Sequence, residues 1–116
     1  MANKINLRRA NEPPKRGDGK RVLVDRLWPR GKSKETLKLD LWLRDIAPST
    51  ELRQWFGHDP VKWPQFRKKY FAELDRNTAA LEPLRELIGK GPVVLIFNAA
   101  DTEHNNAVAL REYLQR

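Results

Sequence analysis

The sequence predicts an α/β fold: a small three-layer domain in which a mainly parallel sheet of about four strands is flanked by helices. Short apolar segments that suit buried strands, such as VLV at residues 22–24 and VVLIF at residues 93–97, alternate with segments of helical periodicity. This alternation favours a parallel sheet, because the connection between two parallel strands usually contains a helix. The length of 116 residues suits one domain over residues 1–116.

The first part of the chain contains two predicted strands joined by a loop. Residues 4–9 (KINLRR) form a short first strand. Residues 21–27 form the second strand, whose continuous apolar centre is typical of a strand covered on both faces. Residues 11–20 contain two prolines and two glycines without apolar periodicity, which indicates a loop.

The middle of the chain gives weaker signals. Ser33 follows a glycine and is a suitable N-cap for a short helix. In residues 39–48, alternating leucines favour a strand, whereas apolar residues at spacings of three and four favour a helix; we prefer a strand that ends before Pro48. Ser49 or Thr50 then begins a further helix.

The second half is clearer. Asp59 precedes Pro60 as a helix cap, and a helix follows whose apolar stripe contains Trp63, Phe66, Tyr70, Phe71 and Leu74. Another helix is marked by Leu81, Leu84, Leu87 and Ile88.

Prolines and glycines set the predicted limits of that second helix. Pro83 is expected in its first turn, since proline within a helix removes a hydrogen bond, and residues 89–92 (GKGP) end it. The strand at residues 93–97 follows, and a last helix over residues 102–114 closes the predicted fold.

Charge and composition narrow the possible partners. The formal net charge is +8, and residues 1–35 hold 11 Lys and Arg against 4 Asp and Glu. A localised positive charge favours phosphates, acidic metabolites or nucleic acid as partners, although a basic surface also serves solubility alone. Cysteine is absent, which excludes disulfides and thiolate chemistry, and no apolar run approaches the length of a membrane span. We therefore expect a soluble, cytoplasmic protein without a membrane partner.

The end of the second predicted strand is the first candidate site. The stretch DRLWPRG changes abruptly from an apolar strand to charged residues, and ligands of parallel sheets bind beyond the carboxyl ends of the strands. Arg26 and Arg30 are candidate anion ligands, Trp28 is a candidate wall, and Asp25 is a candidate proton donor or acceptor. The alternative is that Asp25 pairs with a nearby arginine and the segment is purely structural.

The second candidate lies after the strand at residues 93–97, in the stretch NAADTEHNN. The start of the last helix offers free backbone N–H groups to an anion, but Asp101 or Thr102 as the cap would occupy them. His104 is a candidate acid or base, and Asn105 a candidate polar ligand. We expect the ends of the two strands, near Asp25 and near residue 100, to open onto one positively charged hollow.

Other chemistries find little support. The patterns GxGxxG, GxxxxGK[ST], GxSxG and HExxH are absent, and His58 reads as a turn residue. A metal site formed by Asp25, Asp101 and His104 is conceivable but lacks a recognised ligand pattern, so we predict neither a metal nor another cofactor. No nucleic-acid-binding module is recognisable either.

Three motifs resemble a known family: RVLVDRLWPRGKSKE, LDLWLRDIAPSTELRQWFGHDP and DTEHNNAV. They are similar to the YeaO-like branch of a bacterial family of unknown function, over residues 4–114. The resemblance implies a compact α/β domain and no established reaction. Members commonly carry Asn-His where this chain has Asn105-Asn106, and the positions of Asp101, Glu103 and His104 vary. The resemblance carries over two groups of residues without a known role: Asp25, Arg26, Trp28, Pro29, Arg30 and Gly31, and then Pro48, Ser49, Thr50, Glu51 and Arg53.

Three functions remain open from the sequence. The first is binding of a small phosphate- or carboxylate-bearing ligand at the strand ends, either with or without enzymatic activity. The second is a nucleic-acid accessory role for the basic N-terminal third. The third is a small interaction or regulatory domain whose hollow is only structural. The oligomeric state is not predicted.

Overall fold

The computed structural model describes residues 4–116, so the first three residues of the predicted domain lie outside the described part. A single parallel sheet has the strand order β1-β4-β2-β3. The strands are β1 (Ile5–Arg9), β2 (Lys20–Leu23), β3 (Leu41–Trp42) and β4 (Val93–Phe97). The predicted parallel sheet of four strands is therefore confirmed.

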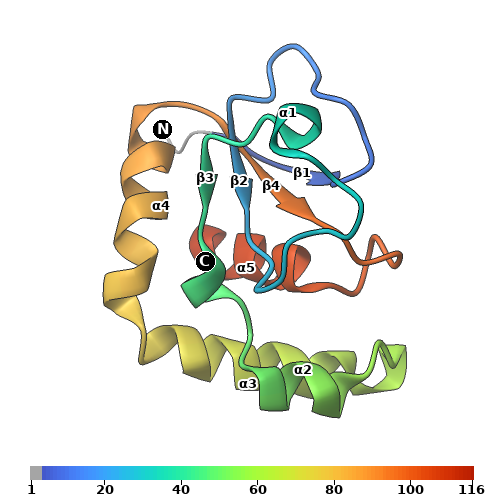
Figure 1. The fold of residues 1–116 in the computed structure, drawn as a ribbon. Coiled ribbons are helices and arrows are strands. Elements are labelled where there is room, and N and C mark those ends of the chain that lie inside the picture. The colour runs from blue at the N-terminus through green and yellow to red at the C-terminus, as the bar shows by residue number, and fades with distance from the viewer. Residues whose placement is uncertain (1–3) are drawn as a thin grey trace.

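Helices cover both faces of this sheet and also its carboxyl end. They are α1 (Lys34–Leu37), α2 (Thr50–Phe56), α3 (Trp63–Asp75), α4 (Thr78–Lys90) and α5 (Asn106–Gln115). Figure 1 shows α1 on one face, α5 on the other, and α2 and α3 together beyond the strand ends. Ser33 and Ser49 cap α1 and α2 through their hydroxyl groups, as predicted.

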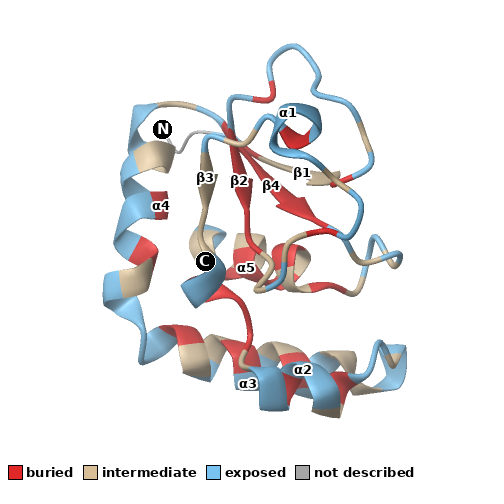
Figure 2. Cartoon of the chain, in the orientation of Figure 1, coloured by how far each residue is buried: buried red, intermediate tan, exposed pale blue. Residues whose placement is uncertain are grey.

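Alternate residues of the strands enter two separate cores. Val22, Val93 and Leu95 pack towards α3 and α5 in the larger cluster, whereas Leu23 and Val94 pack towards α1 in the smaller one. This period of two is the ordinary side-chain alternation of a strand. All five residues of β4 are buried, which explains its purely apolar sequence (Figure 2).

Strand β2 is shorter than predicted, because it ends at Leu23 rather than at residue 27. The Val24 amide still donates to the Ile96 carbonyl, and the chain then leaves the sheet. The side chain of Asp25 accepts a hydrogen bond from the Asn98 amide, and that of Arg26 donates to the Pro48 carbonyl. The polar residues thus stop the strand because their side chains bind the backbone of neighbouring segments.

The ambiguous segment before Pro48 contains both structures that its pattern suggested. A two-residue strand, β3, is followed by a 3₁₀ turn at Arg44–Ile46. Ile46 is buried in the larger core, and its carbonyl accepts a hydrogen bond from the buried Tyr70 hydroxyl at 2.6 Å. Preference for a strand through the whole segment was therefore wrong beyond Trp42.

Helix α4 begins earlier than predicted, since Pro83 lies inside it and not in its first turn. A proline inside a helix costs about 3 kcal/mol. Leu81 and Leu84 are fully buried on the same helix, and each buried leucine stabilises the fold by about 1.5–3 kcal/mol. Tertiary burial therefore outweighs the local penalty.

The last helix begins later than predicted, at Asn106 rather than at residue 102. The Asp101 carboxylate accepts the backbone N–H groups of Glu103 and His104 and so forms a separate turn. Asn105 is the true N-cap, because its side-chain oxygen accepts the Val108 N–H. The free amides predicted around residues 101–104 are thus already occupied by the chain's own side chains.

Candidate functional site

The carboxyl ends of β2 and β4 open onto one shared cleft. These strands are neighbours, with Leu23 paired to Ile96, so the segments that follow them lie side by side. The cleft has a volume of about 790 Å³ and reaches the α2–α3 layer. Every site residue proposed from the sequence lies on its wall: Asp25, Arg26, Trp28, Arg30, Asp101, His104 and Asn105.

Asp25 is fixed at the centre of the two segments. One carboxylate oxygen accepts the Asn98 backbone N–H at 2.9 Å, and the other accepts the Asn106 side-chain amide at 3.1 Å. Desolvation raises the pKa of this carboxyl, although the hydrogen bonds from Asn106 and Asn98 and the charge of Arg53 act in the opposite direction. Asp25 forms no ion pair with an arginine among residues 4–116, contrary to the structural alternative considered from the sequence.

Three arginines line the cleft, and none of them is paired with a carboxylate of the described residues. Arg26 donates to the backbone carbonyls of Pro48 and Ala47 at 3.4 and 3.3 Å, which orients its guanidinium group. Arg30 and Arg53 are exposed. Guanidinium groups that are not neutralised internally are suitable ligands for phosphate or carboxylate groups.

Trp28 has a structural role in addition to lining the cleft. Its indole N–H donates to the Lys32 carbonyl at 2.7 Å, and its ring meets Trp42 edge-on with centroids 5.4 Å apart. The Trp42 indole in turn donates to the Asp25 carbonyl at 2.8 Å. The two tryptophans therefore hold the turn that carries Arg26 and Arg30.

Asp101 and His104 form a pair on the opposite segment. Asp101 contacts His104 Nδ1 at 2.9 Å, and the imidazole meets the Trp63 ring edge-on at 5.4 Å. The backbone N–H of Glu103, the His104 side chain and the His104 N–H lower the pKa of Asp101. Asp101 is thus a turn-forming carboxylate that orients His104, rather than a free ligand group.

Asn105 and Asn106 join the two segments. Asn105 is buried, with its amide nitrogen donating to the Asp101 carbonyl and its oxygen capping α5. The Asn106 amide nitrogen donates both to Asp25 and to the Val24 carbonyl at 3.0 Å. Asn105 therefore joins the Asp101 turn to the start of α5, and its ligand role stays a prediction.

Several cleft residues were not selected from the sequence. Arg53, Phe56 and His58 come from α2 and the turn that follows it, and Phe66 comes from α3. Their position depends on how α2 and α3 cross the sheet end, which local patterns do not specify. Arg53 did carry one signal, since it belongs to the APSTELR motif.

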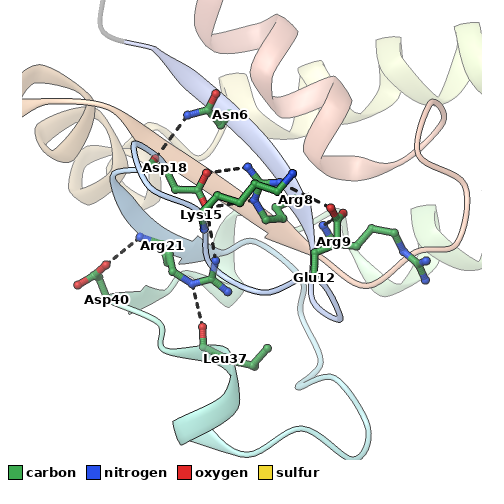
Figure 3. A network of polar contacts seen from close by, with 9 residues as sticks. All are labelled: Asn6, Arg8, Arg9, Glu12, Lys15, Asp18, Arg21, Leu37 and Asp40. Carbon is green, nitrogen blue, oxygen red and sulfur yellow. Dashed lines mark hydrogen bonds and ion pairs between the residues drawn. The ribbon is translucent and has the colours of Figure 1, made fainter.

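Part of the basic N-terminal charge is used inside the fold. Arg8 makes two hydrogen bonds to the carboxylate of buried Asp18, at 3.0 and 2.6 Å, and Arg21 lies 3.9 Å from the same group. Arg21 also donates to the Leu37 carbonyl and is only 5% exposed. Figure 3 shows this network, which ties the loop of residues 11–19 to the sheet face under α1.

The described residues contain neither a cluster of metal ligands nor a membrane-spanning helix. Within residues 4–116, no three His, Asp or Glu side chains gather as metal ligands would, although Asp25, Asp101 and His104 share the cleft. None of the described helices combines the length and apolarity needed to cross a bilayer.

Fold and site together define a small α/β protein with an arginine-lined cleft at the carboxyl end of a parallel sheet. Residues 4–116 match the model of a family described as the inactive DUF488-N3 subclade, so the chain belongs to this family. It is 40% identical over 111 residues to the uncharacterized protein YeaO of Escherichia coli, which covers 96% of each chain. It is 36% identical to the uncharacterized protein Rv3073c of Mycobacterium tuberculosis, over 96% of this chain and 93% of that protein. No solved structure shows significant similarity to the chain.

Proposed function

We propose that the cleft binds a small anionic ligand, bearing a phosphate or carboxylate group, and that the chain acts as a binding protein. One observation carries this proposal: Arg26, Arg30 and Arg53 line the cleft without carboxylate partners, while both acidic residues of the cleft are held by donors of the chain itself. Three guanidinium groups and two carboxylates line the cleft, so an excess of positive charge remains, and an anion supplies the missing partner.

The arrangement also favours binding through preorganisation. Arg26 uses two of its five N–H donors on backbone carbonyls, which limits its motion and leaves the other donors for a ligand. A hydrogen bond to a charged group contributes about 1.5–3 kcal/mol when its geometry is good. Two or three arginines around one anion are thus sufficient for a measurable affinity.

The residues of the cleft favour a binding protein over an enzyme. The family description itself calls the subclade inactive. Both oxygens of Asp25 accept hydrogen bonds from the protein. These contacts suit a rigid wall, so Asp25 is assigned to positioning in this proposal rather than to proton transfer.

Nucleic-acid binding receives less support. The basic excess near the N-terminus includes Arg8 and Arg21, which are engaged in the internal network, and Arg9, which donates to the Ala99 carbonyl. The exposed lysines that remain are consistent with solubility. A cytoplasmic location is also part of the proposal, because small phosphate- or carboxylate-bearing ligands are available in the cytoplasm.

Calorimetric titration with inorganic phosphate at constant ionic strength tests the proposal. We expect saturable binding that weakens about tenfold or more in Arg30→Ala and in Arg53→Ala, because each loses a charge-assisted hydrogen bond. Arg85→Ala is the matched control, since Arg85 is exposed on α4 and does not line the cleft. Equal weakening in all three variants would indicate only a general charge effect and would contradict the proposal.

A further inference from the structure

The cleft is larger than an inorganic anion requires. Its volume of about 790 Å³ lies in the range of pockets that hold organic ligands, about 300–1,000 Å³. A phosphate or sulfate ion at the arginines would leave most of this space to water. The size of the cleft therefore indicates that the anionic group belongs to a larger molecule.

An uncovered apolar side chain lies beside the arginines. Leu27 is 60% exposed, and Val61 is the only other large hydrophobic side chain among residues 4–116 that is exposed. Leu27 stands in the turn between Arg26 and Arg30, and it lines the cleft together with Trp28 and Pro29. Burial of this exposed part would be favourable, because it removes apolar surface from water. An apolar part of a ligand would recover that stabilisation next to the charge-binding groups.

Further apolar surface comes from the opposite wall. Phe56 and Phe66 line the cleft from α2 and α3 with the small part of each residue that stays accessible, 5% and 2%, and their rings stack with centroids 4.4 Å apart. Pro48 also lines the cleft, and its carbonyl accepts a hydrogen bond from Arg26. The cleft thus combines cations and apolar side chains along its walls, which suits a flat ring better than a flexible polar chain.

Unused amide atoms provide hydrogen bonds for the edge of such a ring. The side chain of Asn98 is exposed and makes no hydrogen bond within residues 4–116. The side-chain oxygen of Asn106 receives no donor there either, because only its nitrogen is used. One carboxamide offers both a donor and an acceptor, the combination that matches the ring edge of a nucleobase.

We propose that the ligand is an organic anion whose charged group is joined to a flat, unsaturated ring with hydrogen-bonding atoms, which is the chemistry of a nucleoside monophosphate. The arginines hold the anionic group, and the ring lies against Leu27 with its edge towards Asn98. This inference rests on the proposed function, since it assigns the remainder of the ligand in the same cleft.

Calorimetry with four probes separates the two proposals. Inorganic phosphate, ribose 5-phosphate, adenosine 5′-monophosphate and uridine 5′-monophosphate are titrated at constant ionic strength. The tighter of the two nucleotides is expected to bind at least about tenfold more tightly than ribose 5-phosphate, because burial of the ring removes apolar surface from water.

Two variants locate the ring. Leu27→Ser should remove most of the difference in affinity between the nucleotide and ribose 5-phosphate, because it weakens nucleotide binding far more than ribose 5-phosphate binding. Val61→Ser is the matched control, since Val61 is 87% exposed and does not line the cleft. Arg53→Ala should weaken the binding of the nucleotide and of ribose 5-phosphate by the same factor.

The failures of the two proposals are distinguishable. Equal affinities for nucleotides and ribose 5-phosphate, both dependent on Arg53, would overturn the ring proposal and leave anion binding intact. A nucleotide advantage that persists in Leu27→Ser would also overturn it. If none of the four probes binds, or if binding is unchanged in the arginine variants, both the ring proposal and the anion-binding proposal are overturned.

Discussion

Asp25 and Asn106 stand 81 residues apart in the sequence, and the Asn106 side-chain amide donates to the Asp25 carboxylate at 3.1 Å. The same amide nitrogen donates to the Val24 carbonyl at 3.0 Å. These two bonds attach the beginning of α5 to the end of β2. They therefore hold together the two segments that form the cleft.

Removal of the amide in Asn106→Ala should destabilise the protein. The substitution leaves the Val24 carbonyl and one Asp25 oxygen without this donor, and an unsatisfied, partly buried acceptor costs about 1–3 kcal/mol. The free energy of unfolding from urea denaturation measures the loss. Asn77→Ala is the control, because Asn77 is exposed and its single side-chain bond, to the Asp45 carbonyl, should contribute about 0.5–1 kcal/mol. Equal losses of unfolding free energy in the two variants would contradict this role of Asn106.

Asp18→Asn should lower the free energy of unfolding more than Asn106→Ala does. Asp18 is the carboxylate that balances the charges of Arg8 and Arg21 beneath α1. Breaking a buried ion pair by removing one partner costs about 3–5 kcal/mol, because the remaining charge stays in a poorly solvated place. Glu12→Gln is the control: the contact of Glu12 with Arg8 is 3.6 Å long and its side chain is 42% exposed, so a loss of less than about 1 kcal/mol is expected.

The same aspartate predicts a dependence of stability on pH. Burial raises the pKa of Asp18, but the Arg8 hydrogen bonds, the Lys15 N–H and the charges of Arg8 and Arg21 outweigh this effect, so the pKa is lowered in the folded state. A lowered carboxyl pKa stabilises the fold above the unfolded value of about 3.9, and this contribution is lost as the pH falls below it. Urea denaturation between pH 6 and pH 2.5 should show that the free energy of unfolding falls more steeply with decreasing pH for the native sequence than for Asp18→Asn. Parallel curves would be incompatible with this role of Asp18.

Gly19 permits the loop to approach the sheet. A Cβ atom at Gly19 would lie 1.9 Å from the Pro92 carbonyl oxygen, whereas one at Gly17 would meet nothing within 4 Å. Both glycines have similar positive φ angles, +82° and +88°, so backbone strain alone costs about 1–2 kcal/mol in each alanine variant. Gly19→Ala should therefore have a far lower midpoint of thermal unfolding than Gly17→Ala. Similar midpoints would show that the close approach is not required.

Anion affinity should depend on pH through Asp25. Desolvation raises the pKa of this carboxyl against the opposing effects of Asn106, Asn98 and Arg53. Tyr70 interacts electrostatically with Asp25, and Asp101 and His104 are further ionisable groups of the same cleft. Protonation removes a negative charge beside the bound anion, which is worth about 1 kcal/mol or about fivefold in affinity. Sulfate, which keeps its charge in this range, should bind more tightly at pH 4 than at pH 7. Asp25→Asn should show a smaller change, and an identical pH profile would exclude Asp25 as the cause.

The sequence predicted the sheet well because the strands carry strong local signals. VVLIF has no polar residue, and the change from VLV to Asp25 marks the end of β2, although the strand stops earlier than residue 27. The neighbouring position of these two strand ends followed from the general behaviour of parallel sheets, and their pairing confirms it.

The errors arose where two local signals compete. Asp101 and Asn105 are both good N-caps, and the structure uses the first for a turn and the second for the helix. Pro83 was expected to limit α4, but the burial of Leu81 and Leu84 decides the outcome. Arg53 reaches the cleft from another layer of the fold, and such long-range placement has no local pattern.

The position of the bound anion is the most direct evidence for or against an anion-binding cleft. A titration of ¹⁵N-labelled protein with phosphate, followed by ¹H–¹⁵N correlation spectra at constant ionic strength, reports on the backbone amides. We expect saturable shifts concentrated in residues 25–30 and 98–106, at the ends of β2 and β4. Shifts confined to the basic loop of residues 11–20 and to α1, or weak shifts over the whole surface, would contradict binding in the cleft.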